Sequence, residues 1–238
     1  MTIAKRELKS YFESPVAYVF LVVFLLLTGF FTFFVSAFYE VGQADLGRFF
    51  QWHPWVFLIL VPAASMRLWA EERRAGTIEL LLTLPITTTQ AIVGKYLAAW
   101  LFLVLALALT FPIVIWTYYL GSPDGGAILG GYIGSALMAG TYLAVGMLTS
   151  AMTRNQVISF VVGLVICLLL LMAGWQPVTS MFSRWAPEWL VSSVAAVSFM
   201  PHFESLQRGV LDLRDLLYYA SVIGFMLFMT HLVIQNRK

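Results

Sequence analysis

Charged residues are scarce in this chain, and their scarcity excludes a water-soluble globular fold. Asp, Glu, Lys and Arg make up 11% of the 238 residues, whereas 61% of the residues are hydrophobic. A soluble domain usually has about a quarter charged residues and about half apolar ones. The ionic groups are too few to cover the apolar surface, so lipid must be the solvent for much of the chain. We therefore expect an integral membrane protein.

Cysteine is almost absent as well. The one cysteine, Cys167, lies in an apolar run, which excludes an intrachain disulfide and gives no support for redox chemistry. The net charge is only +2, and the basic residues cluster at the ends of apolar runs. A basic stripe of the kind that binds nucleic acid is therefore missing, and we expect no nucleic-acid partner.

Catalytic and cofactor motifs are also missing. The pair Gly94-Lys95 does not complete a phosphate-binding loop, because Thr89 stands where the motif needs glycine. The three histidines, His53, His202 and His231, lack the spacing of metal ligands. No Ser/His/Asp arrangement appears. We expect no enzyme activity, no metal and no cofactor bound by this chain itself.

Six apolar stretches are long enough to cross a bilayer as helices, which needs about 20 residues each. The second is the weakest, because Pro54 and Pro62 interrupt it and Arg67 near its end must reach the interface. The first is too long for a signal peptide, so we interpret it as a retained span. The expected spans are 16–39, 53–70, 96–120, 127–150, 157–175 and 216–234.

The distribution of Lys and Arg predicts the orientation of these spans. With the N-terminus inside, the external segments hold four basic residues, Arg48, Arg184, Arg208 and Arg214, and the cytoplasmic segments hold the other ten. This asymmetry follows the positive-inside rule and predicts that both termini are cytoplasmic. No span has an acidic residue between its ends, so an ion-coupled secondary transporter would lack its usual relay.

Two segments outside the spans have the composition of membrane-associated helices. Residues 1–14 alternate the apolar Leu8, Tyr11 and Phe12 with basic residues, which predicts an interfacial amphipathic helix. The external segment 176–215 contains thirteen uncharged residues between Glu188 and His202. We expect it to form re-entrant or interface-lying helices, buried against protein because exposed backbone is not tolerated in lipid.

The fourth span is rich in small residues at four-residue spacing, which places each set on one helix face and allows close approach of another helix. Packing within the chain and a contact between subunits both fit this pattern. The two sets are Gly126, Gly130 and Gly134, and Gly131, Ser135 and Ala139.

The most informative segment, residues 71–90, lies between the second and third spans. Thr77 is a plausible N-cap of a short helix that Pro85 ends, and Thr87 and Gln90 have the spacing of a capping box. Ile78 and two leucines share one face of that helix, and an exposed apolar face needs a cover. The helix either lies on the inner leaflet, with its charges solvated, or docks into a groove on a cytoplasmic partner.

Three stretches of the chain resemble type-2 ABC exporter permeases, and the resemblance extends over nearly the whole chain. The last of them is similar to a branch that serves gliding motility and nitrous-oxide-reductase maturation. The stretches are Arg6-Glu7-Leu8 with Tyr11-Phe12 and Ser14-Pro15; Glu71-Glu72-Arg73-Arg74 through Leu81 and Pro85, with Gly94-Lys95-Tyr96; and His202-Phe203-Glu204 through Arg208-Gly209 to Tyr218-Tyr219.

The resemblance implies an all-α fold with a single membrane domain over residues 1–238, in a bacterial inner membrane. It also implies a second permease, identical or homologous, and separate ABC ATPase subunits that bind ATP and Mg²⁺. The helix after Glu72 would be the coupling helix that contacts the ATPase, which favours docking over a position on the leaflet. The coupling residues that it implies are Glu71, Glu72, Arg73, Arg74, Gly76, Thr77, Ile78, Glu79, Leu80, Leu81 and Thr83.

Charged residues of the external segment have two possible roles. They either gate an exit or dock an external partner protein, or they form a solvated helix start in which Asp212 or Asp215 caps the sixth span. The residues concerned are Glu204, Arg208, Asp212 and Arg214, with Asp215.

The sequence therefore favours the permease subunit of an ATP-driven exporter, which exports a substrate or transmits force outward. The alternative is a membrane scaffold that anchors an envelope or motility assembly without conducting a substrate.

Overall fold

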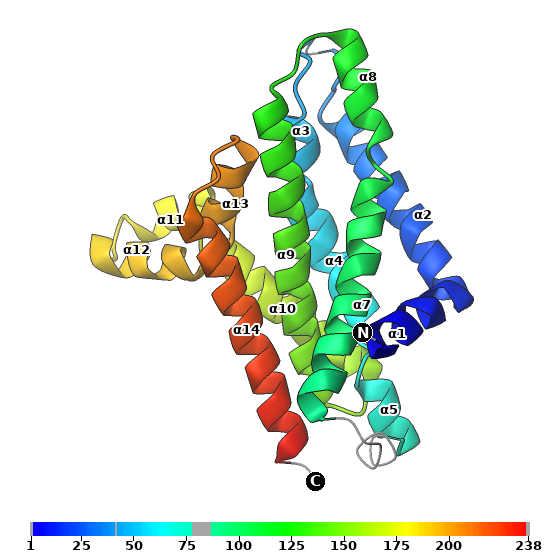
Figure 1. Cartoon of the computed structure of the whole chain (residues 1–238). Coiled ribbons are helices and arrows are strands. Elements are labelled where there is room, and N and C mark those ends of the chain that lie inside the picture. The colour runs from blue at the N-terminus through cyan, green and yellow to red at the C-terminus, as the bar shows by residue number, and fades with distance from the viewer. Residues whose placement is uncertain (1, 41, 78–86, 237–238) are drawn as a thin grey trace.

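The structure is a computed structural model that describes residues 2–40, 42–77 and 87–236, and the elements in this part of the chain are all helical (Figure 1). In chain order they are α1 (Thr2–Glu13), α2 (Pro15–Phe30), a π-helix η1 (Phe31–Val35), α3 (Gly47–Phe50), α4 (His53–Ser65), α5 (Ala70–Ala75), α7 (Thr88–Ala108), α8 (Pro112–Leu120), α9 (Gly125–Met152), α10 (Gln156–Met172), α11 (Gln176–Phe182), α12 (Glu188–Val197), α13 (Met200–Gln207) and α14 (Leu213–Gln235).

The helices confirm an all-α membrane protein with multiple spans. Five helical segments of the described chain are long and apolar enough to cross a membrane. A sixth is obtained when α10 and α11, which meet at a bend of 68°, are counted as one span. Pro112 does interrupt the third span, because α7 ends at Ala108 and α8 begins at the proline.

Side-chain caps fix where the spans begin. Ser14 caps α2, and the predicted capping box of Thr87 and Gln90 starts α7. Asp124 and Asn155 cap α9 and α10 in the same manner. Each helix therefore starts a few residues before the predicted apolar run, because the cap residue and not the first apolar residue sets the boundary.

Helix α9 is the centre of the bundle and packs against α4, α7, α10, α13 and α14. Its glycines allow these contacts. A Cβ at Gly130 would collide with the carbonyl oxygen of Leu206 in α13, and a Cβ at Gly131 would lie 2.5 Å from the Phe50 ring. Both small-residue faces therefore pack within the chain.

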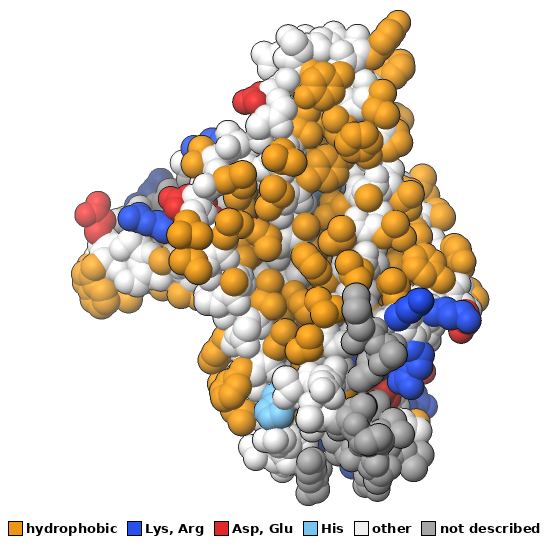
Figure 2. Space-filling view, viewed as in Figure 1, with side chains coloured by type: hydrophobic (Ala, Val, Ile, Leu, Met, Phe, Trp, Pro, Cys, Tyr) orange, Lys and Arg blue, Asp and Glu red, His pale blue; other side chains and the backbone are white. Residues whose placement is uncertain are grey.

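The surface of the bundle has a hydrophobic zone between two charged regions (Figure 2). Side chains in this zone are strongly exposed, such as Leu26 at 66% and Val157 at 66%. Lys and Arg gather where α1, α5 and the start of α7 meet, and we call this the basic end. It corresponds to the side that the sequence predicts to be cytoplasmic.

The external segment confirms the predicted helices but corrects their expected burial. Helices α11 and α12 form a hairpin that projects sideways from the bundle, and no residue of either is buried (Figure 1). Only α13 packs closely, against α9. The hairpin is therefore not buried against the described part of this chain, and each helix satisfies its own backbone hydrogen bonds.

The contact at Gly130 generates a stability prediction. Gly130→Ala should lower the free energy of unfolding by about 2 kcal/mol, because the backbone of α13 must move away from α9. The matched control is Gly224→Ala in α14, where a Cβ would meet nothing within 4 Å. Labelling of the buried Cys167 by a thiol-reactive dye during heating measures the unfolding temperature in detergent. Equal unfolding temperatures for the two variants would contradict this packing.

Candidate functional site

Helix α5 at the basic end contains the first four predicted coupling residues, Glu71 to Arg74. The sequence did not predict a helix here, because this charge run has the appearance of a solvated loop. Residue Trp69, at the N-cap position, gives no side-chain cap to α5. A six-residue helix without its own cap is unstable in isolation, so its neighbours must hold it.

Ser150 of α9 supplies the missing cap. Its hydroxyl oxygen accepts hydrogen bonds from the backbone amides of Trp69 and Ala70, each at 3.0 Å, and donates to the Met66 carbonyl at 2.8 Å. Arg73 adds a second link, because its guanidinium donates to the carbonyl of Ala151. These bonds fix α5 against the last turn of α9.

The end of α5 is set by its own sequence. Gly76 has a left-handed backbone with φ of 70°, which glycine adopts without strain. The Thr77 amide then donates to the Glu72 carbonyl at 3.0 Å, and the Thr77 hydroxyl donates to the same oxygen at 3.3 Å. Thr77 therefore closes α5 in the described structure, and the helix that it was predicted to start falls on residues 78–86, outside the described residues.

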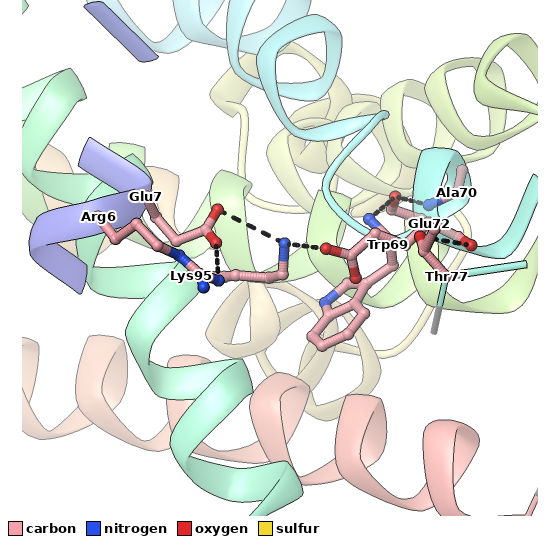
Figure 3. Close-up of polar contacts among 8 residues, drawn as sticks. Arg6, Glu7, Trp69, Ala70, Glu72, Thr77 and Lys95 are labelled. Atoms are coloured by element: carbon pink, nitrogen blue, oxygen red, sulfur yellow. Dashed lines mark hydrogen bonds and ion pairs between the residues drawn. The ribbon is translucent and has the colours of Figure 1, made fainter. Parts of the chain in front are cut away.

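Lys95 in the first turns of α7 connects α5 to the N-terminal helix (Figure 3). Its Nζ lies 2.7 Å from a carboxylate oxygen of Glu72 and 3.6 Å from one of Glu7, while Arg6 pairs with Glu7 at 3.2 Å. Only 5% of Lys95 is exposed. A cation removed from water to this extent needs opposite charges, and the two carboxylates supply them.

Aromatic side chains complete the surroundings of Lys95. Its Nζ lies 5.3 Å from the centre of the buried Trp69 ring, within the range of a cation–π contact. On α1, Tyr11 stacks on Phe102 of α7 with ring centres 5.3 Å apart. Burial raises the pKa of the Tyr11 phenol, so this group stays neutral. Helix α1 is thereby held on α7 by ring packing and by the Glu7–Lys95 ion pair.

We call this arrangement of α5 with Glu7, Lys95, Trp69 and Ser150 the α5 junction. It brings Glu72, Arg73, Gly76 and Thr77 of the predicted set together, while Glu71 and Arg74 are exposed. The remaining predicted coupling residues lie outside the described residues; these are Ile78, Glu79, Leu80, Leu81 and Thr83.

Sequence reasoning did not assign a role to four residues of the α5 junction. Glu7 and Lys95 lie in two of the stretches that carry the family resemblance, and only this position in the sequence indicated that they could have a role. Trp69 and Ser150 gave no signal, because a tryptophan near a span end and a serine in a membrane helix are common. Only the packing of α5 on α9 gives them a role.

The predicted external residues do not form one site. Glu204 and Arg208 pair at 4.0 Å and line a cavity of about 1020 Å³ with Asp45, Asp124 and Glu188. The other two predicted residues, Asp212 and Arg214, lie at the start of α14. The Asp212 side chain accepts a hydrogen bond from the Arg214 amide at 2.9 Å and caps this helix. The helix-start interpretation is therefore correct for that pair.

A histidine–aspartate pair near this cavity was not predicted. His202 Nδ1 lies 2.6 Å from a carboxylate oxygen of Asp215, and its ring stacks on Tyr218 with centres 3.9 Å apart. The pair joins α13 to α14. Among the described residues, no group of three or more His, Cys, Asp or Glu side chains could hold a metal ion.

The burial of Lys95 generates a second prediction. Lys95→Met should lower the free energy of unfolding by roughly 3 kcal/mol, because Glu72 would keep its charge without a partner and Glu7 would keep only Arg6. Lys9→Met is the matched control, since Lys9 is exposed and pairs with Glu13 at 3.7 Å. The same thermal labelling of Cys167 checks both variants. An unfolding temperature for Lys95→Met equal to that of Lys9→Met would show that the buried pair does not stabilise the α5 junction.

Comparison with known proteins was made on the whole chain. A family model described as "ABC-2 family transporter protein" matches residues 54–231. The match begins at α4, includes α5 and Lys95, and ends in α14. No curated protein matches the chain at a significant level. Proteins of this family are in general non-enzymatic membrane components that work with an ABC ATPase subunit. The chain belongs to the ABC-2 family of transporter proteins.

Proposed function

We propose that this chain is the permease subunit of an ABC-type exporter and that a separate ATPase supplies the energy through the segment that begins with α5. The observation that supports this function most directly is the fixation of α5 at three points. Ser150 and Arg73 join it to α9, Glu72 joins it to α7, and Lys95 extends the connection to α1.

These contacts suit transmission of movement. A short helix with bonds at both ends moves as a rigid body, whereas a loop absorbs displacement by changing its dihedral angles. A force on α5 reaches α9 through the hydrogen bonds of its first backbone amides to the Ser150 hydroxyl, and α7 through an ion pair of 2.7 Å. Since α9 packs against α4, α7, α10, α13 and α14, its displacement changes contacts with much of the bundle.

The proposed assembly follows from this role. Two permeases, identical or homologous, pair in the inner membrane with both termini in the cytoplasm, and two ATPase subunits bind ATP and Mg²⁺. The basic end then faces the cytoplasm, in agreement with the positive-inside rule. The coupling residues are Glu71, Glu72, Arg73, Arg74, Gly76 and Thr77, continued by the segment through Thr83.

We further propose that the chain belongs to the branch of the family that serves gliding motility and nitrous-oxide-reductase maturation. In the third resemblance stretch, His202 contacts both Asp215 and Tyr218 where α13 meets α14. These contacts give residues of that stretch a common structural role, which is to join α13 to α14. In this branch the external cavity beside Glu204 and Arg208 would receive a substrate or an external partner protein.

Partner binding tests the coupling role. Gly76→Pro should abolish co-purification with the partner ATPase, because proline cannot adopt a φ of 70° and the exit from α5 would change direction. Gly42→Pro is the matched control at the opposite end: Gly42 also has a positive φ, 63°, and open space around it. Full ATPase binding by the Gly76→Pro variant would disprove docking through this segment.

The orientation has its own test. Cysteines introduced at Arg154, between α9 and α10, and at Ser122, between α8 and α9, are both in exposed positions. In intact cells a membrane-impermeant thiol reagent should label Ser122→Cys, while Arg154→Cys should react only after the membrane is opened. The native chain is the control, since Cys167 is buried. The reverse labelling pattern would place the basic end outside the cell.

A further inference from the structure

Two pockets adjoin where α1 crosses the ends of α2 and α4. One is polar, with a volume of about 380 Å³, and the other is apolar, with a volume of about 230 Å³. Tyr11 and Arg67 line both. The two pockets therefore share one wall, and a molecule with a polar head and an apolar tail would fill both at once.

The apolar pocket is a groove between the first and second spans. Val16, Val19 and Val23 line it from α2, and Leu60 and Ala63 line it from α4. Val16 and Val19 are 53% and 60% exposed, so the groove opens on the hydrophobic surface of the bundle. Its surroundings in a membrane are acyl chains.

Arg67 lies at the boundary between the two pockets. Its side chain is half-buried, and its guanidinium forms no hydrogen bond or ion pair within the described part of the chain. Its positive charge lowers the pKa of the neighbouring Tyr11 phenol, against the larger effect of burial, so the two groups are close. A guanidinium in this position is suited to bind a phosphate.

The polar pocket has carboxylates on its other side. Glu7, Glu71 and Glu72 line it, with Lys95 as the cation that pairs with Glu7 and Glu72. Three carboxylates share this wall with one lysine, so the wall favours a further positively charged hydrogen-bond donor.

We propose that this double pocket binds an aminophospholipid with a zwitterionic headgroup from the adjacent leaflet. One acyl chain occupies the groove between α2 and α4, the phosphate pairs with Arg67, and the primary ammonium donates to Glu71 and Glu72. A purely anionic headgroup would bring no cation to Glu71, the one carboxylate of the three for which the structure shows no ion pair among the described residues. A choline headgroup has no N–H to donate. Because Glu72 belongs to the α5 junction, the bound lipid would contact that junction.

Lipid binding to the purified full-length protein tests this proposal. The protein is stripped of lipid in detergent, and the binding of phosphatidylethanolamine, phosphatidylcholine and phosphatidylglycerol with the same acyl chains is counted by native mass spectrometry. Free phosphoethanolamine tests the headgroup without its chains. We expect phosphatidylethanolamine to bind about tenfold more tightly than the other two lipids, which corresponds to one charge-assisted hydrogen bond, and free phosphoethanolamine not to bind.

Two variants with matched controls locate the site. Arg67→Gln should lower phosphatidylethanolamine binding about tenfold, whereas Arg154→Gln, an exposed cation elsewhere at the basic end, should not. Ala63→Phe fills the groove and should also reduce binding, whereas Leu217→Phe on the exposed surface of α14 should not. Thermal labelling of Cys167 without lipid checks that each variant is folded.

Three results would overturn the proposal. Equal binding of the three lipids would show that the headgroup is not recognised. Unchanged binding by folded Arg67→Gln would place the lipid elsewhere. Binding of free phosphoethanolamine as tightly as the lipid would show a headgroup site without an acyl groove. None of these depends on whether an ATPase binds at α5, so the lipid site and the coupling role can fail separately.

Discussion

Lys95 is a buried cation in a helix that also crosses the hydrophobic zone, and the structure of the basic end depends on how its charge is compensated. An ammonium group with so little contact with water is unfavourable unless carboxylates lie close to it. One carboxylate comes from α5 and the other from α1. The two short helices α1 and α5 are thereby joined to the same point of α7.

Helix α9 is the second constraint, and it acts at both ends of the molecule. At the basic end its Ser150 replaces the cap that α5 lacks. At the opposite end Gly130 lets the backbone of α13 approach closely. The same helix therefore connects the segment that we propose to contact the ATPase with the helices beside the external cavity. This continuity gives an ABC-2 family permease a physical route for coupling the two ends.

The hairpin of α11 and α12 and the lipid pocket show how the membrane completes this fold. Neither hairpin helix has a buried residue, so their apolar side chains need lipid or another subunit as a cover. The groove between α2 and α4 likewise opens on the acyl chains, with Arg67 above it. Both places present apolar side chains that the described part of the chain leaves uncovered.

The sequence by itself determined the membrane class, the number of spans and most of their starts, because these follow from local composition and from caps such as Ser14 and Thr87 that act within one turn. Through the family resemblance it also predicted that Glu72 and Gly76 lie in the coupling segment, which stays a prediction. Only the tertiary structure decided that the run from Glu71 to Arg74 is a helix, since its cap comes from Ser150, about 80 residues away in the chain. It likewise decided that Lys95 is buried and that the small residues of α9 pack within the chain. Burial and capping by distant residues depend on which helices meet, and a local pattern contains no information on that.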